Sequence, residues 1–164
     1  MSAKRSTALL VSLTAGAAIL AGCGSSTLSE QERAGLNEQA VTLQTELATS
    51  GEQASKCATE DKIKKGGLEG VGNCLGKALD KSSAVVTQTS DFVKKLAGNA
   101  SGDCKSKLND FAGALDETAG TLGNASELAK QGQIQKIEKE LQGLTQEQVD
   151  SQVAARDADK ACGG

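Results

Sequence analysis

The segment of residues 75–96, LGKALDKSSAVVTQTSDFVKKL, has the apolar periodicity of an amphipathic helix. Its apolar and small hydroxylated residues recur in steps of three and four: Leu75, Leu79, Ser82, Val86, Thr89, Val93 and Leu96. This spacing places the side chains on one face of an α-helix. We expect the helix to end at Gly98-Asn99, where the glycine would act as a C-terminal cap.

Similar stripes lie on both sides of this segment. The preceding stripe follows a capping box at Ser29 and Glu32 and contains Leu36, Ala40, Leu43, Leu47, Ser50, Ala54 and Cys57. The next one follows Ser101, a plausible N-cap, and contains Cys104, Leu108, Phe111, Leu115, Thr118, Leu122 and Ala129. The last contains Ile134, Ile137, Leu141, Leu144, Val149, Val153, Ala158 and Cys162.

Glycine positions suggest where these helices are connected. Residues 62–73 are rich in lysine and glycine, which predicts a loop. The segment 131–133 predicts a turn, which we favour over a turn at Gly123-Asn124 because the third stripe passes through Gly123 without slipping. In the last helix, Gly143 and the cap-like Thr145 with Gln148 predict a kink or restart.

The predicted fold is all-α, an antiparallel up-down four-helix bundle over residues 29–164. Four helices with short connections normally alternate in direction, and no stretch alternates as a strand would. The chain has no proline to break a long helix. Large apolar residues are sparse, so the core is thin and would benefit from cross-links.

The helix layout favours one of the three possible pairings of Cys57, Cys74, Cys104 and Cys162. Cys57 ends the first helix where the second begins at Cys74, and Cys104 begins the third helix where the fourth ends at Cys162. We therefore predict Cys57–Cys74 and Cys104–Cys162. A turn at Gly123 would instead bring Cys162 to Cys57 or Cys74. A zinc site is a poor alternative, because structural zinc sites usually contain close cysteine pairs.

The N-terminus has the order of a bacterial signal peptide. Lys4 and Arg5 precede an apolar run from Ala8 to Ala21, which is shorter than the about 20 residues that span a bilayer comfortably. Leu20-Ala21-Gly22-Cys23 then resembles the lipobox of bacterial lipoproteins. The resemblance implies that residues 1–22 are removed and that Cys23 receives lipid, with residues 23–28 as a short tether. It also implies a location outside the cytoplasm, on the outer face of a Gram-positive membrane or in a Gram-negative periplasm.

Composition excludes several kinds of chemistry. The chain has no His, Trp or Tyr, so it lacks a histidine base, a histidine-ligated metal and an aromatic platform for sugars or bases. A net charge of −3 argues against nucleic acid as a partner. Acidic residues interleave with lysines as on solvated helix faces. We therefore expect no catalytic residue, no metal and no cofactor.

The sequence favours a binding or structural module of the cell envelope that contacts a protein partner. The candidate contact is Lys62, Lys64 and Lys65, which the bundle layout places at the pole away from the membrane. The alternative is a carrier of a small amphipathic or lipid-like ligand, because an alanine-rich core can leave a cavity. An exposed apolar patch would favour the first function and an enclosed apolar cavity the second.

Overall fold

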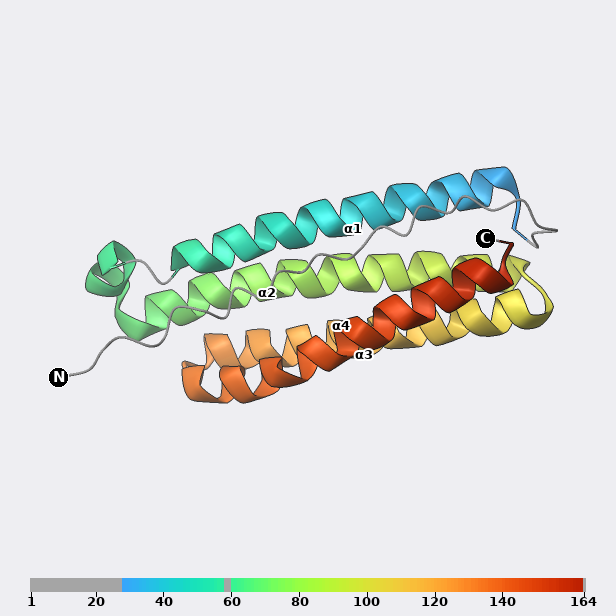
Figure 1. Ribbon diagram of the computed structural model, residues 1–164. Helices are drawn as coiled ribbons and strands as arrows, with labels where there is room; N and C mark the ends of the chain where they lie inside the picture. The colour runs from blue at the N-terminus through green and yellow to red at the C-terminus, as the bar shows by residue number, and fades with distance from the viewer. Residues whose placement is uncertain (1–27, 58–59, 164) are drawn as a thin grey trace.

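The described part of the protein forms four long helices that run side by side (Figure 1). Its structure, a computed structural model, describes residues 28–57 and 60–163. The helices are α1 (Glu30–Cys57), α2 (Glu60–Asn99), α3 (Gly102–Lys130) and α4 (Ile134–Ala161). Consecutive helices run in opposite directions, and the described residues contain no strand. The predicted all-α, up-down bundle is confirmed.

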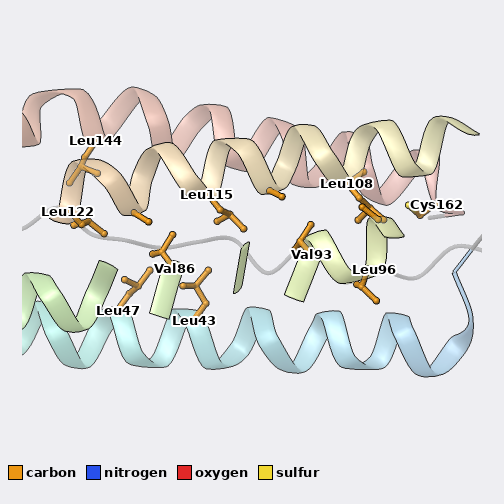
Figure 2. Close-up of a cluster of buried hydrophobic side chains, with 14 of the residues drawn as sticks. Leu43, Leu47, Val86, Val93, Leu96, Leu108, Leu115, Leu122, Leu144 and Cys162 are labelled. Atoms are coloured by element: carbon orange, nitrogen blue, oxygen red, sulfur yellow. The ribbon is translucent and has the colours of Figure 1, made fainter. Parts of the chain in front are cut away.

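The closest helix pairs are the consecutive ones. Helix α2 lies between α1 and α3, and α4 packs on α3. One apolar core runs along all four helices, and Figure 2 shows part of it. Most members of the predicted stripes are buried in it, among them Leu43, Leu47, Leu79, Val86, Val93, Leu96, Leu108, Leu115, Leu122, Ile137 and Leu144.

The predicted capping box at the start of α1 is confirmed. The Ser29 backbone N–H donates to the Glu32 carboxylate at 2.9 Å, and the Glu32 N–H donates to the Ser29 hydroxyl at 3.3 Å. The same carboxylate accepts a hydrogen bond from the Asn99 side-chain amide at 3.0 Å. The cap therefore also ties the first turn of α1 to the last residue of α2.

The loop predicted for residues 62–73 is wrong. Helix α2 already begins at Glu60 and has one kink, at Gly67, whose φ of 59° is a conformation that favours glycine. Gly72 and Gly76 lie inside the helix and are buried. A Cβ at position 72 would overlap the carbonyl oxygen of Ala129 on α3, so these glycines permit close helix packing.

The connection between α2 and α3 is a short turn. Helix α2 ends at Asn99 as predicted, but Gly98 lies within the helix, and the positive φ of 56° belongs to Gly102. Ser101 occupies the predicted N-cap position of α3 in an extended conformation, although its side chain makes no capping hydrogen bond.

Helix α3 continues through Gly123, and the turn at residues 131–133 is confirmed, with Gly132 at φ 71°. The kink predicted near Gly143 and Thr145 is wrong, because α4 is continuous. A glycine inside a helix costs only about 1 kcal/mol. Burial of Leu144 next to it holds the chain in register.

Two of the predicted core positions of α4 are also wrong. Val149 and Val153 are 49% and 48% exposed. The buried side chains Ile137, Leu144 and Ala158 are seven and then fourteen residues apart, so they lie on the one face of α4 that packs on α3. At about 100° per residue, Val149 lies roughly half a turn around the helix from Ala158.

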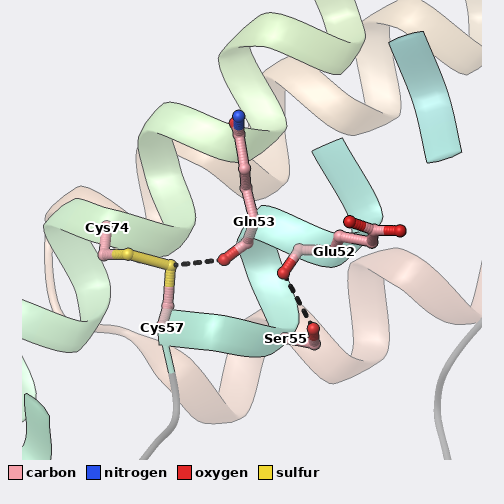
Figure 3. Close-up of a disulfide and its surroundings, with 5 residues drawn as sticks. All are labelled: Glu52, Gln53, Ser55, Cys57 and Cys74. Carbon is pink, nitrogen blue, oxygen red and sulfur yellow. Dashed lines mark hydrogen bonds between the residues drawn. A yellow bond between two sulfur atoms is a disulfide. The ribbon is translucent and has the colours of Figure 1, made fainter. Parts of the chain in front are cut away.

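Each pole of the bundle has a disulfide, and both predicted pairings are confirmed. Cys57–Cys74 joins α1 to α2 with Cα atoms 5.6 Å apart, and Cys104–Cys162 joins α3 to the end of α4 with Cα atoms 4.6 Å apart. Figure 3 shows the first of these, with Cys57 Sγ 3.2 Å from the Gln53 carbonyl oxygen.

Candidate functional site

The interface between α2 and α3 is a seam of small residues with seven-residue spacing. Hydroxyl groups bond across it to the backbone of the opposite helix. Ser83 donates to the Ala119 carbonyl at 2.8 Å, Ser90 to the Ala112 carbonyl at 3.1 Å and Ser126 to the Gly76 carbonyl at 2.9 Å. Each bond stabilises close approach of the two helices, because a buried hydroxyl must find a partner.

Two clusters of charge flank the seam on the same pattern. In the first, Asp116 lies 2.6 Å from the Ser90 hydroxyl and 2.8 Å from Lys94 Nζ. In the second, Asp80 lies 2.5 Å from the Ser126 hydroxyl and 2.8 Å from Lys130 Nζ. We call these the Asp116 cluster and the Asp80 cluster.

Protonation in both clusters follows from these contacts. Hydrogen bonds from Lys94 and then Ser90 hold the pKa of Asp116 below its usual value, and Lys130 and Ser126 do the same for the pKa of Asp80. The hydrogen bond to Asp116 raises the pKa of Lys94. The carboxylates therefore stay ionised and the lysines protonated at neutral pH.

The two clusters are related by an internal repeat that our reading of the sequence missed. Residues 36 positions apart occupy equivalent positions in the two clusters. Asp80, Ser90 and Lys94 correspond in this way to Asp116, Ser126 and Lys130. The signal in the sequence is Ala-Leu-Asp at 78–80 and again at 114–116. Because α2 and α3 are antiparallel, the repeat gives the seam an approximate twofold symmetry.

The seam has the character of a structural element. Ser90 and Ser126 are fully buried, so a substrate cannot reach their hydroxyl groups. A lysine that activates a serine must first lose its proton, whereas these clusters favour the protonated form of the lysine. The arrangement suits the locking of two helices together.

A groove lies between α3 and α4, on the half of the bundle near the Cys104–Cys162 pole. Its volume is about 230 Å³, and it is open to solvent. Aspartates from both helices surround a small apolar floor, and the lining residues are Lys107, Asp110, Asp150, Val153, Ala154 and Asp157.

The charges of this groove are only partly paired. Lys107 Nζ lies 3.3 Å from an Asp110 oxygen. Asp150 accepts a hydrogen bond from the Gln146 amide at 2.9 Å. Within residues 28–57 and 60–163, no cation forms an ion pair with Asp150 or Asp157. The groove therefore has an excess of negative charge.

The sequence-predicted contact residues lie elsewhere. Lys62, Lys64 and Lys65 precede the Gly67 kink, at the pole of the Cys57–Cys74 disulfide. The structure describes their backbone but not their side chains. Cys23, the predicted lipidation site, lies outside the described residues, as do the predicted signal peptide and the predicted tether up to residue 27.

The described part of the chain has neither a candidate metal site nor a membrane-spanning helix. In residues 28–57 and 60–163, His, Cys, Asp and Glu form no group of three that could hold a metal ion. No helix in these ranges is both long and apolar enough to cross a bilayer.

No family model, curated protein or solved structure matches the chain, so functional inference rests on its own residues.

Proposed function

We propose that this protein is a lipid-anchored, non-enzymatic module of the cell envelope that binds a protein partner at a distance from the membrane. The lipobox-like sequence at Leu20–Cys23 supports the anchor and a location outside the cytoplasm. Lipid on Cys23 would attach the chain firmly if it carries two or more acyl chains, because a single chain gives only marginal binding.

The observation that supports the binding role is the separation of the two poles. The described chain enters at Leu28, and α1 then extends for 28 residues to Cys57. At about 1.5 Å per residue this is about 42 Å. The segment of residues 60–66 lies at that far pole, beyond the end of α1 (Figure 1).

A disulfide at each pole suits such a spacer. Cys104–Cys162 secures the end nearest the tether, and Cys57–Cys74 secures the far end. Lys62, Lys64 and Lys65 give the far pole three cations, which suit an acidic surface on a partner. The proposal therefore assigns the anchor to one pole and partner contact to the other.

The anchor is tested by Cys23→Ser in cells of the native host. The unchanged protein should fractionate with membranes and carry acyl mass on Cys23, and Cys23→Ser should lose both properties. Ser26→Ala in the tether is the control and should keep both. Membrane attachment and mass unchanged by Cys23→Ser would contradict the lipid anchor.

Partner contact is tested by a photo-reactive amino acid placed at position 64 and, as a control, at the exposed position 139 on α4. We expect a discrete protein adduct from position 64, which Lys62→Glu with Lys65→Glu abolishes. Lys77→Glu with Lys95→Glu should leave the adduct intact. The same adducts from positions 64 and 139 would contradict a partner site at the far pole.

Carriage of a small amphipathic ligand is the alternative from the sequence. A carrier of that kind needs an enclosed, mainly apolar cavity. The groove between α3 and α4 is open and has three aspartates among its lining residues. It gives no support to a carrier, and we do not propose that function.

A further inference from the structure

The outer face of α4 presents apolar side chains that the fold leaves uncovered. Val149 and Val153 lie one turn apart and are both about half exposed. Val153 also lines the groove with Ala154. Solvent exposure of scattered valines is ordinary, but here an exposed valine coincides with a groove and with unpaired charge.

The acidic residues of α4 surround this apolar site in a regular way. Asp150 precedes Val153 by three residues and Asp157 follows it by four. The two carboxylates are therefore two helical turns apart, about 10 Å along the axis, with Val153 and Ala154 between them. The order along the groove is acid, apolar, acid.

Helix α3 adds to the negative character of the groove. Its cation, Lys107, is already paired with Asp110. The field at Lys107 is negative, since Asp110 first and then the charges of Asp157 and Asp103 raise its pKa. Lys160 follows Asp157 by one turn, but no ion pair joins the two.

We propose that this groove binds a basic helical segment of a protein partner, with two cations spaced two turns apart and an apolar side chain between them. The cations would meet Asp150 and Asp157, and the apolar side chain would cover Val153 and Ala154. Helix-in-groove recognition commonly uses anchors at this spacing. Opposite charge at the rim speeds association and fixes register.

A bare cation is a poorer occupant of the groove. The aspartates form no metal-binding group of three within the described chain. A basic lipid surface is also a poor fit, because biological membranes are anionic. The proposal does not depend on the lysines of the far pole or on lipidation, so it can fail while the proposed function stands.

The test uses the full-length protein, solubilised in non-ionic detergent. The probe is a fluorescent, alanine-based helical peptide with two lysines seven residues apart and one leucine midway between them. Binding is measured by fluorescence anisotropy. A peptide of the same composition with adjacent lysines is the control. We expect the spaced peptide to bind more tightly, with an affinity that falls as salt rises.

Substitutions in the protein locate the site. Asp150→Asn with Asp157→Asn should weaken binding roughly tenfold, which corresponds to about 1.4 kcal/mol. Val153→Ser should weaken it by about threefold, on the scale of partial apolar burial. The matched controls are Asp91→Asn with Glu38→Gln, and Val41→Ser, because these side chains are exposed but lie outside the groove.

Several outcomes would overturn the proposal. One is equal affinity for the spaced and adjacent peptides. Another is an effect of Asp150→Asn with Asp157→Asn no larger than that of the control pair. A third is tight binding of calcium alone that depends on Asp150 and Asp157, since it would assign the groove to an ion.

Discussion

The interface between α2 and α3 is more extensively packed than the interface between α3 and α4. In the first, glycine and serine bring two backbones together, and buried hydroxyls bond to carbonyls across the seam. In the second, Thr121 and Asn124 bond to glutamate side chains of α4, and Ser151 donates to the Ala114 carbonyl at 3.4 Å. A groove lies open between these two helices nearer the Cys104–Cys162 pole. Helices α2 and α3 therefore form a closely packed pair, and α4 packs less extensively on α3.

The Cys104–Cys162 disulfide secures the looser side. It closes a 58-residue separation, whereas Cys57–Cys74 closes 17. A cross-link across a longer loop restricts the unfolded chain more strongly. The longer-range bridge therefore joins α4 to α3, and neither bridge joins α2 to α3.

Loss of the Cys104–Cys162 bridge should give the largest effect. In the chain-entropy relation, Cys104→Ala with Cys162→Ala lowers the free energy of unfolding by about 4 kcal/mol, against about 3 kcal/mol for Cys57→Ala with Cys74→Ala. Urea unfolding of both pairs measures this order. A larger loss from the short bridge would contradict loop length as the main source of the stabilisation.

The second largest loss of stability is expected from a side chain added between α2 and α3. Gly72→Ala forces a Cβ against the Ala129 carbonyl, and overpacking of this kind costs about 1–3 kcal/mol. Gly70→Ala is the control, because no atom lies within 4 Å of a Cβ there and alanine favours a helix. Thermal unfolding should show a lower Tm for Gly72→Ala only. Equal Tm values would contradict a close approach at position 72.

The repeat predicts matched losses from its two serines. Ser90→Ala and Ser126→Ala each remove a hydroxyl whose one proton is shared between a backbone carbonyl and an aspartate carboxylate, which costs about 1–2 kcal/mol. Ser106→Ala on the exposed face of α3 should be nearly neutral. Urea midpoints compare the three, and a large effect of one serine alone would break the symmetry.

The smallest effect concerns acid stability. The pKa values of Asp80 and Asp116 are lower in the folded state than in the unfolded state. The two carboxylates therefore contribute fully to the free energy of unfolding above about pH 4, and this contribution is lost as the pH falls through their folded-state pKa values. Asp80→Asn with Asp116→Asn should flatten this acid-side loss of stability. Glu38→Gln with Glu117→Gln, both exposed, should leave it unchanged. Urea midpoints between about pH 5 and pH 2 measure it.

Except for the start of α2, sequence periodicity was enough to predict the helices and the disulfides, because Leu43, Val86 and Leu115 follow the 3.6-residue spacing that burial requires. Glycine was the main source of error. Gly72 looks like a loop residue in the sequence, but α3 lies against it, and only the packed structure shows why a side chain is excluded.

The groove could not be predicted for a related reason. Val149 and Val153 fit a continuous apolar stripe in the sequence. Their exposure becomes clear only from the structure, which shows which face of α4 packs on α3. Lys107 and Asp150 come from different helices, so their proximity is a product of the fold. The repeat of Ala-Leu-Asp was visible in the sequence and predicts a symmetry that the two charge clusters realise.

The contrast between the sealed seam and the looser fourth helix is tested most directly by native-state hydrogen exchange with and without a reductant. We predict that backbone amides of α2 and α3 beside Ser83, Ser90 and Ser126 exchange most slowly in both conditions. Amides of α4 from Asp150 to Ala158 should exchange faster, and reduction should speed them further while the seam stays protected. Equal protection of α4 and the seam after reduction would contradict the account.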